Sequence, residues 1–220
     1  IPKVGGTKDV NIARVRELAP THLIVNIDEN RREVIEEMAQ FVPHVIVTHP
    51  LKPEDNHDLY RLFGGIFYRE AQSLVLAQRL TGAFSELRRA VRELPRENVL
   101  YLIWKKPWMS VARDTYISAT LAAAGWDTLP QENAARYPEI DLSEAWLRDV
   151  DRVLLSTEPY RFREKHLAEI AVLPALQGKP VQLIDGEMTS WYGSRAIEGL
   201  RHLARMRVDL AGTKKTKGHL

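Results

Sequence analysis

One stretch constrains this chain more than any other: residues 68–94, YREAQSLVLAQRLTGAFSELRRAVREL, carry its longest uninterrupted helical pattern. Apolar residues recur there at steps of three and four, at Ala77, Leu80, Phe84, Leu87, Val91 and Leu94. Pro95 ends the pattern, because proline disfavours helical geometry in the residue before it. A helix over this stretch is roughly 40 Å long at 1.5 Å per residue. We therefore expect a rigid backbone helix that joins two lobes and allows little motion between them.

Strand and helix patterns alternate on both sides of this helix. Short apolar runs predict two strands before it, THLIVNI (21–27) and HVIVTHP (44–50), and four after it, at 98–104, 127–130, 151–157 and 181–186. Such alternation is typical of parallel α/β sheets. The predicted fold is two parallel-sheet α/β lobes joined by one long backbone helix. The predicted limits are an N-terminal lobe at 1–67, the linking helix at 68–95, a C-terminal lobe at 96–209 and a polar tail at 210–220.

The two expected strands of the first lobe are few for a parallel sheet covered on both faces, so we expect this lobe to be incomplete. Local signals also predict helix ends. Asp9 or Asn11 is expected to cap the first helix, Asn30 the second, and Ser143 a helix over 142–149. A glycine pair at 64–65 is expected to stop the helix that begins near residue 53.

Composition excludes several classes of function. The chain has no cysteine, which excludes disulfides, thiolate catalysis and cysteine metal sites. Basic and acidic residues number 31 and 29, so no overall field favours nucleic acid. No apolar run reaches the ~20 residues that span a bilayer, and no signal sequence is present. The first residue is Ile1, which leaves a processed or deleted N-terminus open.

Aromatic residues gather just after the predicted strands of the second lobe. Ligands of open α/β sheets bind at the carboxyl ends of the strands, so these loops predict an apolar recess with a polar rim. The candidate ligand contacts are Trp104, Trp108, Met109, Tyr160, Trp191 and Tyr192, with Asn30 from the first lobe. We place the two remaining tryptophans, Trp126 and Trp146, in the core.

Catalytic motifs are absent from the sequence. It contains no G-x-S-x-G, no phosphate-binding P-loop and no G-x-G-x-x-G between a strand and a helix. The seven histidines are scattered, so no metal site is predicted. Glu158 and Glu187 could form an acid/base pair, but no nucleophile or metal cluster accompanies them. We therefore predict a protein that is not an enzyme.

Several segments resemble one family in order along nearly the whole chain. Residues 4–30, VGGTKDVNIARVRELAPTHLIVNIDEN, resemble the first-lobe segment of the substrate-binding proteins of ABC importers for cobalamin, haem and iron-siderophores. The long helix resembles the rigid backbone helix of that family, and residues 154–166 and 183–203 resemble its second-lobe loops. Within them, DGEMTSWYGSR (185–195) is most similar to the cobalamin-binding subgroup. Family members begin with a further strand and helix, so the resemblance implies that the first lobe here lacks them.

The resemblance implies a solute receptor that holds a cobalamin-like corrinoid, or another metal-bearing macrocycle or chelate, in the cleft between two lobes. It also implies a monomer without a resident cofactor, in the periplasm or cell envelope, that docks on an ABC permease through an acidic residue on each lobe. The docking candidates are Glu29 and Glu33 in the first lobe, and Glu158 and Glu187 in the second. Haem or a ferric siderophore is the alternative ligand. A two-lobe enzyme or metal-binding scaffold is a competing interpretation, as is a cytoplasmic interaction module that kept the fold, which applies if the chain is native as given.

Overall fold

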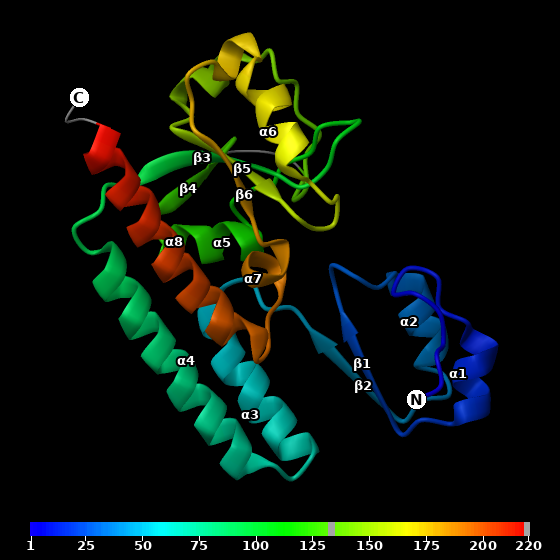
Figure 1. Cartoon of the computed structure of the whole chain (residues 1–220). Coiled ribbons are helices and arrows are strands. Elements are labelled where there is room, and N and C mark those ends of the chain that lie inside the picture. The colour runs from blue at the N-terminus through cyan, green and yellow to red at the C-terminus, as the bar shows by residue number, and fades with distance from the viewer. Residues whose placement is uncertain (132–134, 218–220) are drawn as a thin grey trace. The chain divides into compact units, whose positions relative to one another are not determined.

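The computed structural model describes residues 1–131 and 135–217, with side chains through residue 212. The chain forms two compact units, Ile1–Pro50 and Leu51–Leu220 (Figure 1). This division falls before residues 51–67, which the sequence pattern assigns to the first lobe. Those residues include a helix that packs along the backbone helix and so belongs to the second unit.

The first unit is a two-stranded parallel sheet with two short helices. Its elements are α1 (Ile12–Leu18), β1 (His22–Asn26), α2 (Arg32–Met38) and β2 (His44–Thr48). The strands pair in parallel from His22 beside His44 to Asn26 beside Thr48. Both strands confirm the sequence prediction. Of the two expected caps of α1, Asn11 is the actual one, since its side chain accepts a hydrogen bond from the amide of Arg14 at 2.9 Å.

The second unit is a four-stranded parallel sheet in the order β4-β3-β5-β6, covered by helices on both faces. Its strands are β3 (Glu97–Leu102), β4 (Trp126–Leu129), β5 (Arg152–Ser156) and β6 (Val181–Ile184). Its α-helices are α3 (Asn56–Ile66), α4 (Glu70–Val91), α5 (Tyr116–Ala123), α6 (Glu164–Ala171), α7 (Gly186–Ser190) and α8 (Arg195–Lys217). Within the described residues of this unit, the 3₁₀ turns are η1 (Pro53–Asp55), η2 (Ala145–Asp149) and η3 (Pro174–Leu176).

Alternate residues of β3 build two separate cores. Val99 and Tyr101 face one core with side chains of α3, α4, α5 and α8, while Leu100 and Leu102 face the other with side chains of α6, η2 and η3. All four of these side chains are fully buried. This alternation is the period of two that a strand imposes, and it lets a near-continuous apolar run serve both faces.

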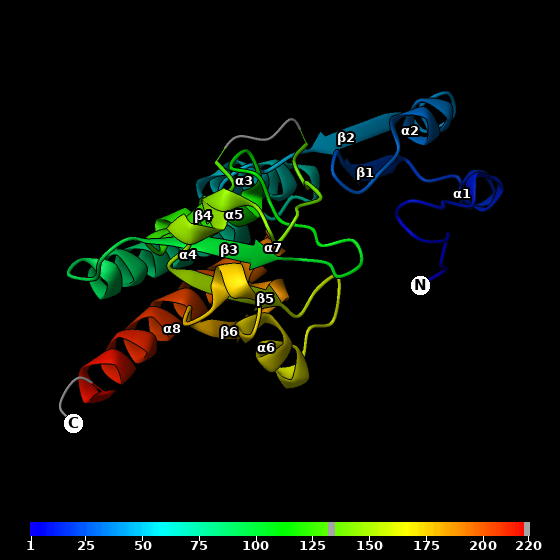
Figure 2. The same ribbon diagram turned by 90° about the horizontal axis from the view of Figure 1, so that it is seen from above.

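The predicted backbone helix is α4, which begins two residues and ends four residues inside the expected limits of 68–95. Leu80, Phe84 and Leu87 of the expected stripe are buried against the core. α4 packs along α8, and the two helices lie side by side in both views (Figure 1, Figure 2). An ion pair joins them, since Arg201 Nε lies 3.1 Å from a carboxylate oxygen of Glu86.

Three local predictions were wrong. Asn30 does not cap α2, because its side-chain oxygen accepts from the amide of Asn26 and Arg31 occupies the cap position. Ser143 does not cap a helix: its amide donates to Asp141, and the segment that follows is the 3₁₀ turn η2. The glycine pair does not stop α3, which continues to Ile66.

Packing explains the position of one of these glycines, and one further difference lies at the end of α8. Gly64 is inside α3 because a Cβ there would lie 2.7 Å from the Ser73 hydroxyl oxygen, so glycine permits the close approach of α4. α8 continues to Lys217, past residue 210 where a polar tail was expected. Residues 218–220 of that expected tail lie outside the described residues.

Candidate ligand-binding site

The carboxyl ends of β3, β5 and β6 lie at one edge of the second sheet, since the three strands run parallel. Two of the loops that follow are held together by backbone hydrogen bonds. The amide of Ile103 donates to the carbonyl of Met109 at 3.0 Å, and the amide of Tyr160 donates to the carbonyl of Ile103 at 3.2 Å. The parallel strands and these hydrogen bonds therefore place the loops, and their aromatic residues, at a common edge.

One group of aromatic rings joins the loops after β3 and β5 on the side of α6. We call Trp104, Trp108, Tyr160, Phe162 and His166 the Trp104 cluster. The rings of Trp104 and Tyr160 meet edge-on at 5.6 Å, and those of Trp108 and Phe162 stack at 6.4 Å. Phe162 is buried, whereas Trp104 keeps 38% of its surface exposed. The cluster thus has a buried base and one exposed indole.

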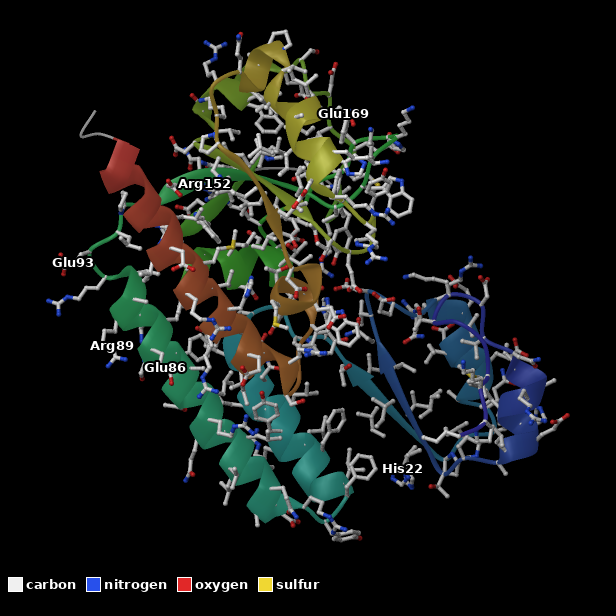
Figure 3. All side chains as sticks on the ribbon, viewed as in Figure 1. His22, Glu86, Arg89, Glu93, Arg152 and Glu169 are labelled. Carbon is white, nitrogen blue, oxygen red and sulfur yellow. The ribbon has the colours of Figure 1, made fainter. Side chains whose placement is uncertain are left out.

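Charged residues border the Trp104 cluster. Lys105 lies over the Trp108 ring and donates a hydrogen bond of 2.6 Å to Glu169. Glu169 lies on α6 (Figure 3). This hydrogen bond lowers the pKa of Glu169. Burial lowers the pKa of His166, whose Nδ1 accepts from the amide of Arg163 at 2.8 Å. Near neutral pH the rim therefore carries an ion pair beside a neutral imidazole.

A second group lies on the loops after β5 and β6. We call Glu158, Glu187, Trp191 and Arg195 the Trp191 cluster. The indole Nε1 of Trp191 donates to Glu158 at 3.1 Å, and the Arg195 guanidinium lies 5.7 Å from the centre of the indole ring. Arg195 also pairs with Glu187 at 3.0 Å. Trp191 keeps 48% of its surface exposed, so its ring is held in place and still presents a face to solvent.

A set of buried hydroxyl groups is hydrogen-bonded to the backbone of the Trp191 cluster at Glu158. The Tyr101 hydroxyl donates to Ser156 Oγ at 3.0 Å and lies 2.6 Å from Thr189 Oγ1. Ser156 in turn donates to the carbonyl of Glu158. Burial raises the pKa of Tyr101 to about 12, so this phenol stays protonated at physiological pH. We call Tyr101, Ser156 and Thr189 the Tyr101 network.

Gly186 permits α7 to begin directly above the Tyr101 network. A Cβ at this position would lie 2.6 Å from Ser156 Oγ and 2.8 Å from the amide nitrogen of Glu158. Only glycine avoids that overlap, so the short helix that leads to Trp191 can start against the loop that carries Glu158.

We predict that Tyr101→Phe lowers the free energy of unfolding by about 1 kcal/mol, because it removes a buried donor but keeps the ring. Urea unfolding followed by circular dichroism measures this change. The matched control is Tyr68→Phe, since Tyr68 is 81% exposed and should show no change. Equal stability of the two variants would show that the Tyr101 hydroxyl contributes nothing.

The two remaining candidates in the second unit, Tyr192 and Met109, lie next to the indoles along the backbone, but their side chains pack into the fold. Tyr192 meets Tyr116 of α5 edge-on at 5.8 Å and is partly buried. Met109 is also partly buried and packs against the core shared by α4 and α8. Trp126 is fully buried in β4, as expected, and Trp146 is partly buried in η2. The ligand contacts expected from the sequence remain predictions.

In the first unit, polar residues follow β1. Asn30 accepts a hydrogen bond from the amide of Asn26 and donates one to the carbonyl of Thr7, so its amide is bonded to backbone on both sides. Glu29 accepts from the Thr7 hydroxyl at 3.1 Å, and Glu33 is exposed in the first turn of α2. Both carboxylates thus lie near the surface of this unit.

Sequence reasoning missed the Tyr101 network. The signal was a single tyrosine in the otherwise apolar run NVLYLIW, where a buried phenol needs a partner. Among the described residues, no group of three or more His, Cys, Asp or Glu side chains could hold a metal ion. In the same part of the chain, every helix is too short or too polar to cross a membrane.

Comparison with known proteins shows the fold of periplasmic substrate-binding proteins. No protein-family model matches this sequence, and no curated protein matches it. Among solved structures, the periplasmic vitamin B12 binding protein BtuF of Vibrio cholerae superimposes with a TM-score of 0.80 at 14% identity, over 96% of this chain and 82% of that one.

Two haem-binding proteins are also similar in structure. The periplasmic heme-binding protein RhuT from Roseiflexus sp. RS-1 gives a TM-score of 0.77 at 18% identity, over 95% of this chain and 83% of that one. The periplasmic heme-binding protein HutB of Vibrio cholerae gives a TM-score of 0.75 at 17% identity, over 96% of this chain and 84% of that one. The expected two-lobe α/β fold is confirmed, and at these identities the likeness extends to the fold alone.

Proposed function

We propose that this protein is the solute receptor of an ABC importer and that it binds a cobalamin-like corrinoid at the aromatic edge of the second unit. The observation that carries the proposal is the pair of partly exposed indoles, Trp104 and Trp191, each fixed by neighbouring groups on loops at the carboxyl ends of the strands. A large flat macrocycle offers faces for such rings to stack on. Preorganised rings lose little entropy on binding.

The structural neighbours support the same class of ligand. Their names specify vitamin B12 and haem, which are both flat metal-bearing macrocycles. These neighbours are named as binding proteins, which agrees with a protein that carries rather than converts its ligand. Their periplasmic location makes the cell envelope the expected location of this protein.

Haem is the second candidate ligand. Tyr160 is partly exposed within the Trp104 cluster, and a tyrosine phenolate is one of the side chains that ligate haem iron. A corrinoid needs no such ligand from the protein if the indoles stack on it. Tyr160 is therefore expected to be needed for haem binding but not for corrinoid binding.

An absorption experiment tests the proposal. The protein is mixed separately with cyanocobalamin, haem and a ferric siderophore, and unbound ligand is removed by gel filtration. The corrinoid spectrum is expected to co-elute with the protein. Co-elution of haem, abolished by Tyr160→Phe, would favour the second candidate. If none of the three co-elutes, the receptor proposal fails and an interaction module with this fold becomes the better account.

We also propose that the permease docks on Glu29 or Glu33 of the first unit and on Glu158 or Glu187 of the second. Glu33 is the clearest candidate of the first pair because it is exposed at the start of a helix. The variants Glu33→Gln and Glu187→Gln should weaken binding to proteoliposomes that carry a corrinoid permease, with Glu36→Gln, an exposed carboxylate of the same helix, as control. Unchanged binding of both variants would remove these residues from the docking surface.

A further inference from the structure

The loop that carries Trp191 is tied to the first residues of the second unit. The chain enters this unit at Leu51, forms η1, and begins α3 at Asn56. Asn56 is completely buried although it is polar. A buried side-chain amide is costly unless its donors and acceptor are hydrogen-bonded, so its partners identify what it holds.

The partners of Asn56 lie in three separate parts of the second unit. Its Oδ1 accepts a 2.6 Å hydrogen bond from the amide of Gly193. Its Nδ2 donates to the carbonyl of Pro53 at 2.8 Å and to the hydroxyl of Tyr116 at 3.1 Å. One side chain thus connects the entry segment, α5, and the loop two residues after Trp191.

A second hydrogen bond from α3 reaches the same peptide. The hydroxyl of Tyr60 donates to the carbonyl of Gly193 at 2.8 Å. Both backbone polar groups of Gly193 are therefore bonded to side chains of α3. Burial raises the pKa of Tyr60 to about 12, so its hydroxyl remains a donor at physiological pH. Gly193 itself has a φ of 71°, a conformation that suits glycine.

We call the hydrogen bonds from Asn56 and Tyr60 to Gly193 the tether. The position of the loop explains why it needs the tether. It connects α7, a helix of five residues, to α8, and Trp191 projects from it with half of its surface exposed. Tyr192 adds an edge-on contact with the Tyr116 ring, whose hydroxyl is bonded to Asn56. These bonds therefore hold the loop at Gly193, while the Tyr101 network contacts α7 at Thr189.

We propose that Asn56 is a positioning residue for the ligand site: it fixes the Trp191–Gly193 loop so that the Trp191 ring is preorganised for stacking. This inference rests on the proposed function, in which Trp191 contacts the ligand. It adds that residues 51–56, which follow the boundary at Pro50, move as one body with the Trp191 loop. A ligand that binds Trp191 therefore gains affinity from a residue that it does not touch.

The test is a double-mutant cycle with hydrogen exchange as a ligand-free readout. The variants are Asn56→Ala, Trp191→Ala and the double variant, titrated with cyanocobalamin by calorimetry. Asn56→Ala is expected to weaken binding about two- to tenfold, the loss from one or two hydrogen bonds. In the Trp191→Ala background, Asn56→Ala should weaken cyanocobalamin binding less than about twofold, because the effects of coupled residues are not additive. Amides of residues 191–194 should exchange faster in Asn56→Ala.

One control and one alternative variant separate positioning from general destabilisation. Asn98→Ala removes another side-chain amide that donates to a backbone carbonyl, that of Asp149, at the amino end of β3, and it should leave affinity and loop exchange unchanged. If Asn56→Ala does not fold, Tyr60→Phe removes one bond to Gly193 and keeps its ring, so it carries the same comparison.

Each outcome decides the proposal. The proposal would be overturned if the affinity losses of Asn56→Ala and Trp191→Ala were fully additive. It would also be overturned if amide exchange at residues 191–194 were unchanged in Asn56→Ala. If cyanocobalamin, haem and a ferric siderophore all fail to bind but exchange at the loop rises, the tether stands and the proposed function fails. If the ligand binds and the loop stays protected, the function stands and the tether fails.

Discussion

Replacing Glu97 by alanine is expected to lower the free energy of unfolding by about 3–5 kcal/mol, the cost of removing one partner from a buried ion group. Glu97 is buried at the start of β3 and accepts hydrogen bonds from Arg152 Nε at 3.0 Å and from Arg207 Nη1 at 2.8 Å. The Trp126 indole donates to the same carboxylate at 3.0 Å. Its loss would leave two buried guanidinium groups without this counter-charge.

Glu97→Ala is expected to change stability and not ligand binding, because the buried ion group lies away from the aromatic clusters. Arg152 begins β5, and Figure 3 shows it on the sheet. Its partner Glu97 begins β3, so both residues lie at the amino ends of the strands, whereas the aromatic clusters lie at the carboxyl ends. Burial lowers the pKa of Arg207, and the charge of Glu97 opposes this effect. Removing Glu97 therefore makes the charged form of Arg207 more costly to bury.

Equilibrium unfolding in guanidinium chloride measures the change. Asp127→Ala is the matched control, because Asp127 also pairs with an arginine, Arg96 at 2.6 Å, but at the surface. An exposed pair of this kind contributes about 0–1 kcal/mol. A loss below about 1 kcal/mol for Glu97→Ala, equal to the control, would mean that the buried group does not stabilise the fold.

Replacing Trp191 by alanine is expected to weaken ligand binding by about 1–3 kcal/mol, or roughly 5- to 150-fold, while stability stays close to that of the parent protein. The ring is half exposed, so its loss removes less buried surface than the loss of a core tryptophan would. It is also fixed by the hydrogen bond to Glu158 and by Arg195, which makes it a preorganised anchor. Calorimetric titration of the variant with cyanocobalamin measures the loss.

Trp146→Ala is the matched control for Trp191. Trp146 also donates its indole nitrogen to a glutamate, Glu144, at 2.9 Å, but it lies in η2, outside the loops at the carboxyl ends of the strands. Its loss should leave affinity unchanged. Glu158→Gln keeps an acceptor for the indole, so its affinity should stay near that of the parent. Unchanged affinity in Trp191→Ala would remove this ring from the site.

The strands could be predicted from sequence because their signal is local. THLIVNI and HVIVTHP are short runs rich in β-branched apolar residues, and β1 and β2 lie inside them. The backbone helix was equally clear, since its stripe continues over several turns. The aromatic residues after β3, β5 and β6 could be placed at one edge because parallel strands bring their carboxyl ends together.

Further features depend on contacts that no local pattern reveals. α7 has five residues, too few for a periodic signal, so the sequence of GEMTS predicts a loop where the structure has a helix. Glu97 and Arg152 look like ordinary surface charges in the sequence, although they are buried together. Asn56 resembles a helix-cap residue, and its bond to Gly193 joins positions far apart in the chain. Gly64 has the local signal of a helix stop, whereas the packing of α4 decides its role.

The central claim is that this protein binds a corrinoid at its aromatic edge, and calorimetric titration tests it most directly. The protein is titrated in separate experiments with cyanocobalamin, haem and a ferric siderophore under identical conditions. We predict saturable one-to-one binding of cyanocobalamin that is tighter than binding of the other two and is weakened by Trp191→Ala. Absence of heat with cyanocobalamin, or binding of cyanocobalamin that Trp191→Ala and Trp104→Ala both leave unchanged, would contradict the account.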